Sequence, residues 1–66
     1  MIHFVEEEIY SLFIGNEIIQ ATGAHPLYIK RNNEINWIEV SDLHVGDLVM
    51  FADKTWHEIF DIQLEI

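Results

Sequence analysis

The sequence contains no cysteine, a single proline and only three basic residues. Without cysteine the chain cannot form a disulfide, a thiolate zinc site or a thiol nucleophile, and nothing indicates its redox compartment. Twelve acidic residues give a formal net charge of −9. Phosphate backbones and anionic lipids repel such a chain, so we expect no direct binding to nucleic acid or to a membrane surface, and basic partners are favoured.

Long hydrophobic runs are also missing. One of the longest, residues 48–52, is far shorter than a membrane span, and the first four residues carry no basic, signal-like segment. We therefore expect a soluble chain, with the cytoplasm as its default location.

Length and composition set the scale of the fold. The 66 residues can hold one small core, and half of them are hydrophobic, which is too apolar for a disordered acidic tail. A chain of this size buries only about 60% of its unfolded surface. We expect one domain over residues 1–66 with marginal stability.

The patterning predicts an all-β fold, because β-branched and aromatic residues recur between short turn signals without helical periodicity. Residues 5–14 and 17–22 flank Gly15-Asn16, which is typical of a hairpin with a type II′ turn. Residues 22–26 interrupt the second strand, since Gly23 tolerates a kink and Pro26 removes a ladder donor.

The second half of the chain predicts another hairpin, one short helical turn and two further strands. Residues 27–30 and 35–40 form the hairpin around a turn at 31–34. Residues 41–47 suit a single helical or 3₁₀ turn that is capped by Ser41 and closed by Gly46. Residues 48–52 predict a central strand, and the turn at 53–54 leads into a strand over 55–66.

Several apolar side chains are candidates for the core. Leu43 should plug it from the helical turn, and the four large aromatic candidates are Trp37, Phe51, Trp56 and Phe60. In the last strand, strict alternation places Trp56, Phe60, Ile62, Leu64 and Ile66 on one face and His57, Asp61, Gln63 and Glu65 on the other.

Three motifs in order carry most of the functional information. A T-x-x-H block, Thr22 to His25, is followed by Pro26; residues 37–49 contain a Trp and a D-L-x-x-G-D turn; and residues 58–65 read E-I-F-D-I-Q-L-E. In order and spacing, from about Leu12 onward, they resemble the Hint (Hedgehog/intein) self-processing domains. The resemblance implies a hairpin-built, Hint-like β-fold with one short helical turn.

Hint domains use an N-terminal Cys or Ser that attacks the preceding peptide bond in an N-to-S or N-to-O acyl shift. By this resemblance, Thr22 would hydrogen-bond the scissile peptide, and His25 would distort it and protonate the leaving amine. Asp61 matches the late-strand aspartate that assists acyl transfer. Trp37, Leu43 and Gly46 match fold-determining positions.

The chain departs from the family pattern at both ends. No Cys, Ser or Thr stands in the entry position of the N-terminal nucleophile block, because Ser11 lies within an apolar run, and no terminal His-Asn pair follows the Asp61 strand. We therefore expect a fragment or degenerate form, about half of a complete domain, with no activity alone. Its partner would be a complementary Hint segment or flanking polypeptide.

Ordinary structural roles compete with the catalytic ones. His25 before a proline can simply bond turn backbone, Thr22 is a common strand residue, and Asp61 can be a solvated carboxylate. His3, His44 and His57 lack the spacing of metal ligands, so we expect neither a metal nor another cofactor.

A second hypothesis belongs to a different class. The chain could be a small acidic β-module, of the inhibitor or immunity type, that binds a basic protein and uses Glu6–Glu8 for electrostatic steering. In either case the apolar strands exceed what 66 residues can readily cover, which favours a homodimer with strands exchanged or paired.

Overall fold

The computed structural model describes residues 8–65, which form one six-stranded antiparallel sheet and a single 3₁₀ turn. The elements are β1 (Ile9–Ile14), β2 (Glu17–Thr22), β3 (Pro26–Arg31), β4 (Glu34–Glu39), η1 (Val40–Asp42), β5 (Leu48–Met50) and β6 (Trp56–Glu65). The all-β prediction is confirmed. Glu6 and Glu7, and the predicted strand residues 5–7 and 66, lie outside the described residues.

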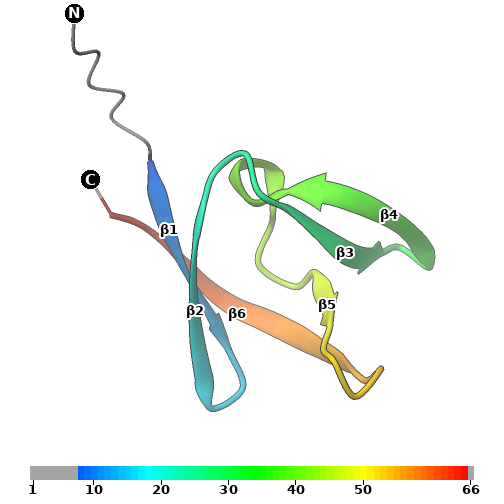
Figure 1. Ribbon diagram of the computed structural model, residues 1–66. Coiled ribbons are helices and arrows are strands. Elements are labelled where there is room, and N and C mark those ends of the chain that lie inside the picture. Colours follow the sequence, from blue (N-terminus) through cyan, green and yellow to red (C-terminus); the bar gives the residue numbers. More distant parts are fainter. Residues whose placement is uncertain (1–7, 66) are drawn as a thin grey trace, which may run out of the picture.

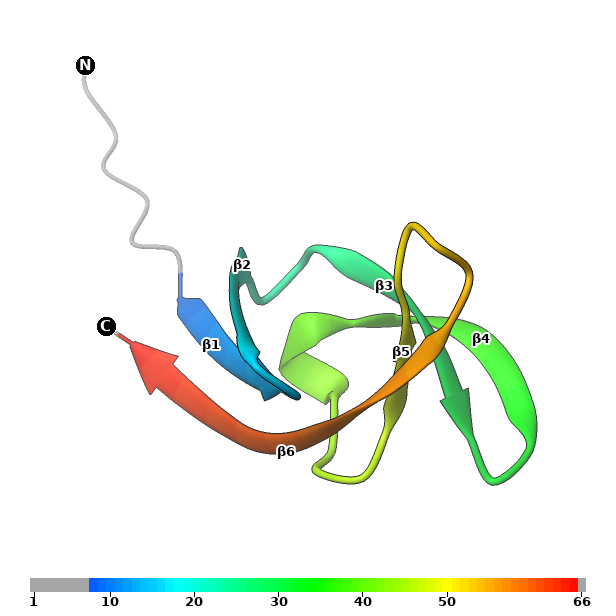
Figure 2. The same cartoon turned by 90° about the horizontal axis from the view of Figure 1, so that it is seen from below.

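The strand order is β2-β1-β6-β5-β3-β4, so β6 lies at the centre of the sheet. Its C-terminal part pairs with β1 and its first residues pair with β5. Figures 1 and 2 show that β6 runs under both halves and curves, so that the β1–β2 hairpin and the β3–β4 hairpin stand on either side of η1. The short β5 is a central strand, as predicted.

The core lies inside this curved sheet and includes residues from both halves. Its buried members are Leu12, Ile14, Ile29, Val40, Leu43, Val49 and Ile59. Leu43 fills the core directly after η1, which confirms its predicted role. Within residues 8–65 we find no helix with the length and apolar character needed to span a membrane.

Both predicted hairpins are present. Gly15 has a φ of +58° and Asn16 is not among the residues with positive φ, as a type II′ turn requires. In the second hairpin Asn32 and Asn33 have φ values of 51° and 65°, which is the pattern of a type I′ turn.

The helical turn differs in detail from the prediction. It begins at Val40, and Ser41 lies within it and makes no capping bond, because the N-cap position falls on Glu39. Gly46 has a φ of +99° but closes a separate turn, in which the N–H of Asp47 donates to the carbonyl of His44 (3.1 Å).

The predicted alternation in β6 holds from Asp61 onward, where Ile62 packs against the core, but a β-bulge makes it wrong for Trp56, His57 and Phe60. Phe13 pairs with Asp61, whereas the next residue, Ile14, pairs with Ile59. The extra residue reverses which face the preceding side chains occupy relative to the later ones. Ile59 is therefore fully buried, and Phe60, a predicted core residue, is 54% exposed.

Trp37 is also not a core residue, since 69% of its surface is exposed, and Trp56 is only half-buried, whereas the half-buried Phe51 packs against the core. The reason lies in the strand register. Trp37 is opposite Tyr28, next to core-facing Ile29, so both rings lie on the outer face of the sheet, which no second layer covers within the described chain.

Candidate functional site

The T-x-x-H block forms a hydrogen-bonded corner between β2 and β3, which we call the Thr22–His25 corner. The N–H of His25 donates to the carbonyl of Thr22 (3.1 Å), and the N–H of Gly23 donates to that of Glu8 (3.1 Å). Two further bonds fasten the corner to η1, from Ser41 N to Gly23 O and from Val40 N to His25 O (both 2.9 Å). Four backbone hydrogen bonds therefore fix the backbone positions of Thr22 and His25.

Gly23 allows this corner to pack closely. A Cβ atom at this position would lie 3.1 Å from Cε1 of Tyr10 and 3.3 Å from Cβ of Ser41. A side chain at this position would require the Tyr10 ring and the Ser41 side chain to shift by a few tenths of an ångström.

A cavity of about 300 Å³ opens beside Thr22. It is lined by Glu8, Thr22, Gly23, Ala24, Glu39 and Ser41. The hydroxyl of Tyr10 donates to Oε2 of Glu8 (3.1 Å), and this bond to a carboxylate raises the pKa of the Tyr10 hydroxyl. Thr22 and Ser41 are the hydroxyl-bearing residues of this lining, and Glu8 and Glu39 are its two carboxylate residues.

The side chains of Thr22 and His25 are free to meet a partner. Thr22 is half-buried and His25 is exposed. Within residues 8–65 neither side chain makes a hydrogen bond, so the backbone alone joins the two residues.

Asp61 lies away from the corner. It is opposite Phe13, whereas Thr22 is opposite Ile9, four residues earlier on β1, or about 13 Å at the usual rise of a strand. The carboxylate of Asp61 accepts the N–H of Ile62 (2.9 Å) and the side-chain amide of Gln63 (3.2 Å). The structure therefore brings Thr22 and His25 together but does not bring Asp61 to them.

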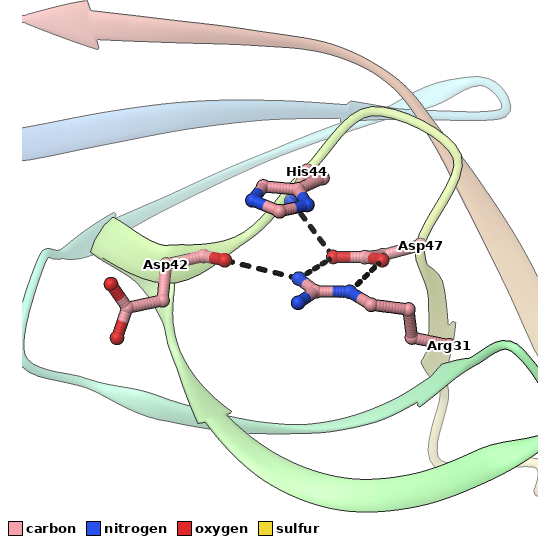
Figure 3. A network of polar contacts seen from close by, with 4 residues as sticks. All are labelled: Arg31, Asp42, His44 and Asp47. Carbon is pink, nitrogen blue, oxygen red and sulfur yellow. Dashed lines mark hydrogen bonds and ion pairs between the residues drawn. The ribbon is translucent and has the colours of Figure 1, made fainter.

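The D-L-x-x-G-D turn contains a polar cluster that the sequence did not reveal. Figure 3 shows the guanidinium of Arg31 forming two bonds to the carboxylate of Asp47, from Nε to Oδ1 and from Nη2 to Oδ2 (both 2.7 Å). Nη2 of Arg31 also donates to the carbonyl of Asp42 (3.0 Å), and the N–H of His44 donates to Oδ2 of Asp47 (2.8 Å). We call this cluster the Arg31–Asp47 clamp.

Electrostatics hold the clamp in its ionised form. Burial would raise the pKa of Asp47, whose side chain is 3% exposed, but the bonds from Arg31 and from the His44 N–H outweigh it and lower that pKa. The bond to Asp47 raises the pKa of Arg31 above its usual value. Because both carboxylate oxygens are occupied, the clamp fastens residues 42–47 to β3 and is unsuited to proton transfer.

A third polar cluster links the β5–β6 turn. Oγ1 of Thr55 donates to Oδ1 of Asp53 (2.6 Å) and lies 2.6 Å from Nε2 of His57, and the ring of Phe51 stacks on that of His57 (centroids 4.0 Å apart). The bonds from Thr55 lower the pKa of Asp53. Since the single hydroxyl proton of Thr55 points to Asp53, His57 must donate to Thr55, so His57 does not activate Thr55 as a nucleophile.

Among the described residues no group of three or more His, Asp or Glu side chains could hold a metal ion. Comparisons of the chain with protein-family models, with curated proteins and with solved structures find no match, so the Thr22–His25 corner stands on its sequence motif and its geometry.

Proposed function

We propose that this chain is part of a Hint-type self-processing domain and is inactive alone. The observation that carries the proposal is the Thr22–His25 corner, which four backbone hydrogen bonds hold beside an open cavity of about 300 Å³. A polypeptide segment that enters this cavity contacts Thr22, and the exposed ring of His25, which does not line the cavity, would have to turn toward the segment.

The chemistry is an N-to-S or N-to-O acyl shift on that segment. The nucleophile of the segment attacks the preceding carbonyl, Thr22 hydrogen-bonds the scissile peptide, and the carbon–nitrogen bond breaks as His25 gives a proton to the leaving amine. Histidine suits this role because its ordinary pKa lies near neutrality. Asp61 is offset from Thr22 by about 13 Å along the strand direction and lies on the other side of β1, so it would serve only a step remote from the corner.

The nucleophile has to come from a partner segment. Ser11 is 3% exposed, its hydroxyl donates to Glu65 (3.4 Å), and it accepts a bond from Gln20 (3.3 Å). It lies opposite Gln20 of β2 and Gln63 of β6, on the same face of the sheet as Thr22, but it is buried among these neighbours. A complementary segment of the Hint type, or a flanking polypeptide, is therefore the proposed partner.

The test is a chimera. The N-terminal part of an established Hint domain, with its nucleophilic cysteine and a reporter peptide ahead of it, is fused to this chain in place of its own second half. We expect thiol-induced release of the reporter, detected by mass spectrometry. Thr22→Ala and His25→Ala should each reduce release at least tenfold, in line with the contribution of one general acid or one oxyanion donor.

Two controls make the result decisive. His44→Ala removes an exposed imidazole outside the corner and should leave release unchanged. The donor domain with its own second half must release the reporter under the same conditions. If it does so and the folded chimera does not, the proposed function is wrong.

We also propose that the free edge of β2 pairs with β2 of a second copy. Within residues 8–65 the only strand that pairs with β2 is β1, and β2 carries Ile18, which is 62% exposed. An unpaired edge strand with an exposed isoleucine is a template for strand addition. The net charge of −9 on each copy opposes the association.

A further inference from the structure

The outer face of the β3–β4 half of the sheet displays a row of three aromatic rings. Tyr28 on β3 lies between Trp37 on β4 and Trp56 at the start of β6. The ring centroids of Tyr28 and Trp37 are 5.0 Å apart, and those of Tyr28 and Trp56 are 6.1 Å apart and nearly parallel. We call these residues the aromatic row.

The row is exposed at Tyr28 and Trp37 and half-buried at Trp56. Trp37 is 69% exposed, Tyr28 is also exposed, and Ile35, which lies on the same face of β4, is exposed beside them. Aromatic side chains supply large contact areas at small entropic cost, and they are enriched where proteins bind one another. An exposed cluster of this kind is a candidate docking surface.

The row already holds one cation. Nζ of Lys30 lies 5.9 Å from the ring centroid of Trp56, within the range of a cation–π interaction. Two exposed carboxylates flank the row on the same face, Glu39 two residues after Trp37 and Glu58 two residues after Trp56. The ring of Trp37 has no such cation among the described residues.

We propose that the aromatic row binds a basic polypeptide segment, with an arginine or lysine of that segment stacked on Trp37 and its neighbours paired with Glu39 and Glu58. Charge selects this occupant. The chain has a net charge of −9, which attracts a basic partner and opposes a second copy of the chain. The three rings of the row do not line the corner cavity, whereas Glu39 borders both surfaces.

The two tryptophans are the only ones in the chain, and both belong to the row, so intrinsic fluorescence reports directly on its occupation. The probes are short peptides in which Ser alternates with Arg, with Lys or with Gln. We expect the Arg peptide to shift the emission and to bind several-fold more tightly than the Lys peptide, because guanidinium stacks on aromatic rings. The Gln peptide should not bind.

Calorimetry on variants locates the site. Trp37→Ala should lower the affinity for the Arg peptide about tenfold, and Glu39→Gln should lower it by a smaller factor. Phe60→Ala is the matched control, since Phe60 is an exposed aromatic residue on the outer face at the bulge, against Phe13. Glu17→Gln controls for loss of one charge at the far end of the sheet. Both controls should bind as the unaltered chain does.

Three results would each overturn the proposal. If the Arg peptide binds equally well to the unaltered chain and to Trp37→Ala, and salt abolishes both interactions, then the binding is diffuse charge attraction. Binding of the Gln peptide as tightly as the Arg peptide would show that charge does not select the occupant. Association of the chain with itself that Trp37→Ala abolishes would show that a second copy covers the row.

Discussion

At the scale of single residues, the Arg31–Asp47 clamp is the most consequential polar contact. Arg31→Ala leaves the carboxylate of Asp47, 3% exposed, without its cation. Because the Arg31 side chain is 32% exposed, we expect this change to lower the free energy of unfolding by about 2 kcal/mol, less than the loss on breaking a fully buried ion pair. Arg31→Lys should lose less, because it keeps the charge but not the two-point geometry.

Denaturant unfolding measures both changes, with Lys54→Ala, at an exposed turn position, as the control. A loss for Arg31→Ala no larger than that for Lys54→Ala would contradict the structural importance of the clamp.

The clamp also gives stability a defined dependence on pH. The pKa of Asp47 is lower in the folded chain than its ordinary value, which is about 3.9 in an unfolded chain. The ionised carboxylate therefore contributes stability that is fully present above about pH 4 and is lost as the pH falls through the folded value. In Asp47→Asn this contribution is absent, so its stability difference from the unaltered chain should shrink below about pH 4.

Thermal unfolding of Asp47→Asn and of the unaltered chain at a series of pH values checks this prediction. A stability difference between the two that stays constant down to pH 2 would contradict it.

Sequence reasoning at this scale found residues that carry a motif and missed residues that meet only in space. Thr22 and His25 are three positions apart, and the structure joins them at one corner. Arg31 and Asp47 are sixteen positions apart, so only the fold reveals their pairing. The only sequence signal for this pair was that Arg31, one of three basic residues in a very acidic chain, borders a turn with two asparagines.

At the scale of elements, the β3–β4 turn offers a clean test of backbone conformation. Asn33 has a φ of 65°, a conformation that glycine adopts at the lowest energetic cost. Asn33→Gly should stabilise the chain by about 0.5 kcal/mol, and Asn33→Ala should destabilise it by about 1 kcal/mol, because alanine tolerates a positive φ less well than asparagine does. Chemical denaturation of the two variants should give changes of opposite sign; changes of the same sign would contradict the turn type.

The hairpins were predictable because each is local, with its turn signal between two apolar runs. The bulge in β6 was not, since nothing in residues 56–65 marks where the register shifts. The shift arises because β6 must pair with both β1 and β5 while it curves around one core. The burial of Ile59 and the exposure of Phe60 follow from it.

At the scale of the whole molecule, the chain alone should not cleave itself. It contains no cysteine, and Ser11 is buried and hydrogen-bonded on its strand. Incubation with hydroxylamine or a thiol should leave the intact mass of 7.8 kDa. Shortened products from a protease-free sample, seen by mass spectrometry, would show that a nucleophile within the chain is active.

Assembly is the second test at this scale. If β2 pairs with a second copy, light scattering should give a mass above 7.8 kDa that rises with salt, because salt screens the repulsion between acidic chains. Ile18→Lys should return the monomer, while Ile35→Lys on the opposite edge strand should not. A monomeric mass at both high and low salt would exclude the dimer.

The central position of β6 has a consequence for how the chain folds during its synthesis. The two hairpins are complete by Glu39, but the strand that unites them comes last among the described elements, and its pairing of Glu65 with Ile9 closes a loop of 65 − 9 = 56 residues. Loop closure over such distances is slow, so a nascent chain carries Leu12, Ile14 and Ile29 uncovered until β6 leaves the ribosome. During that interval we expect chaperones that recognise exposed apolar side chains to bind the incomplete sheet.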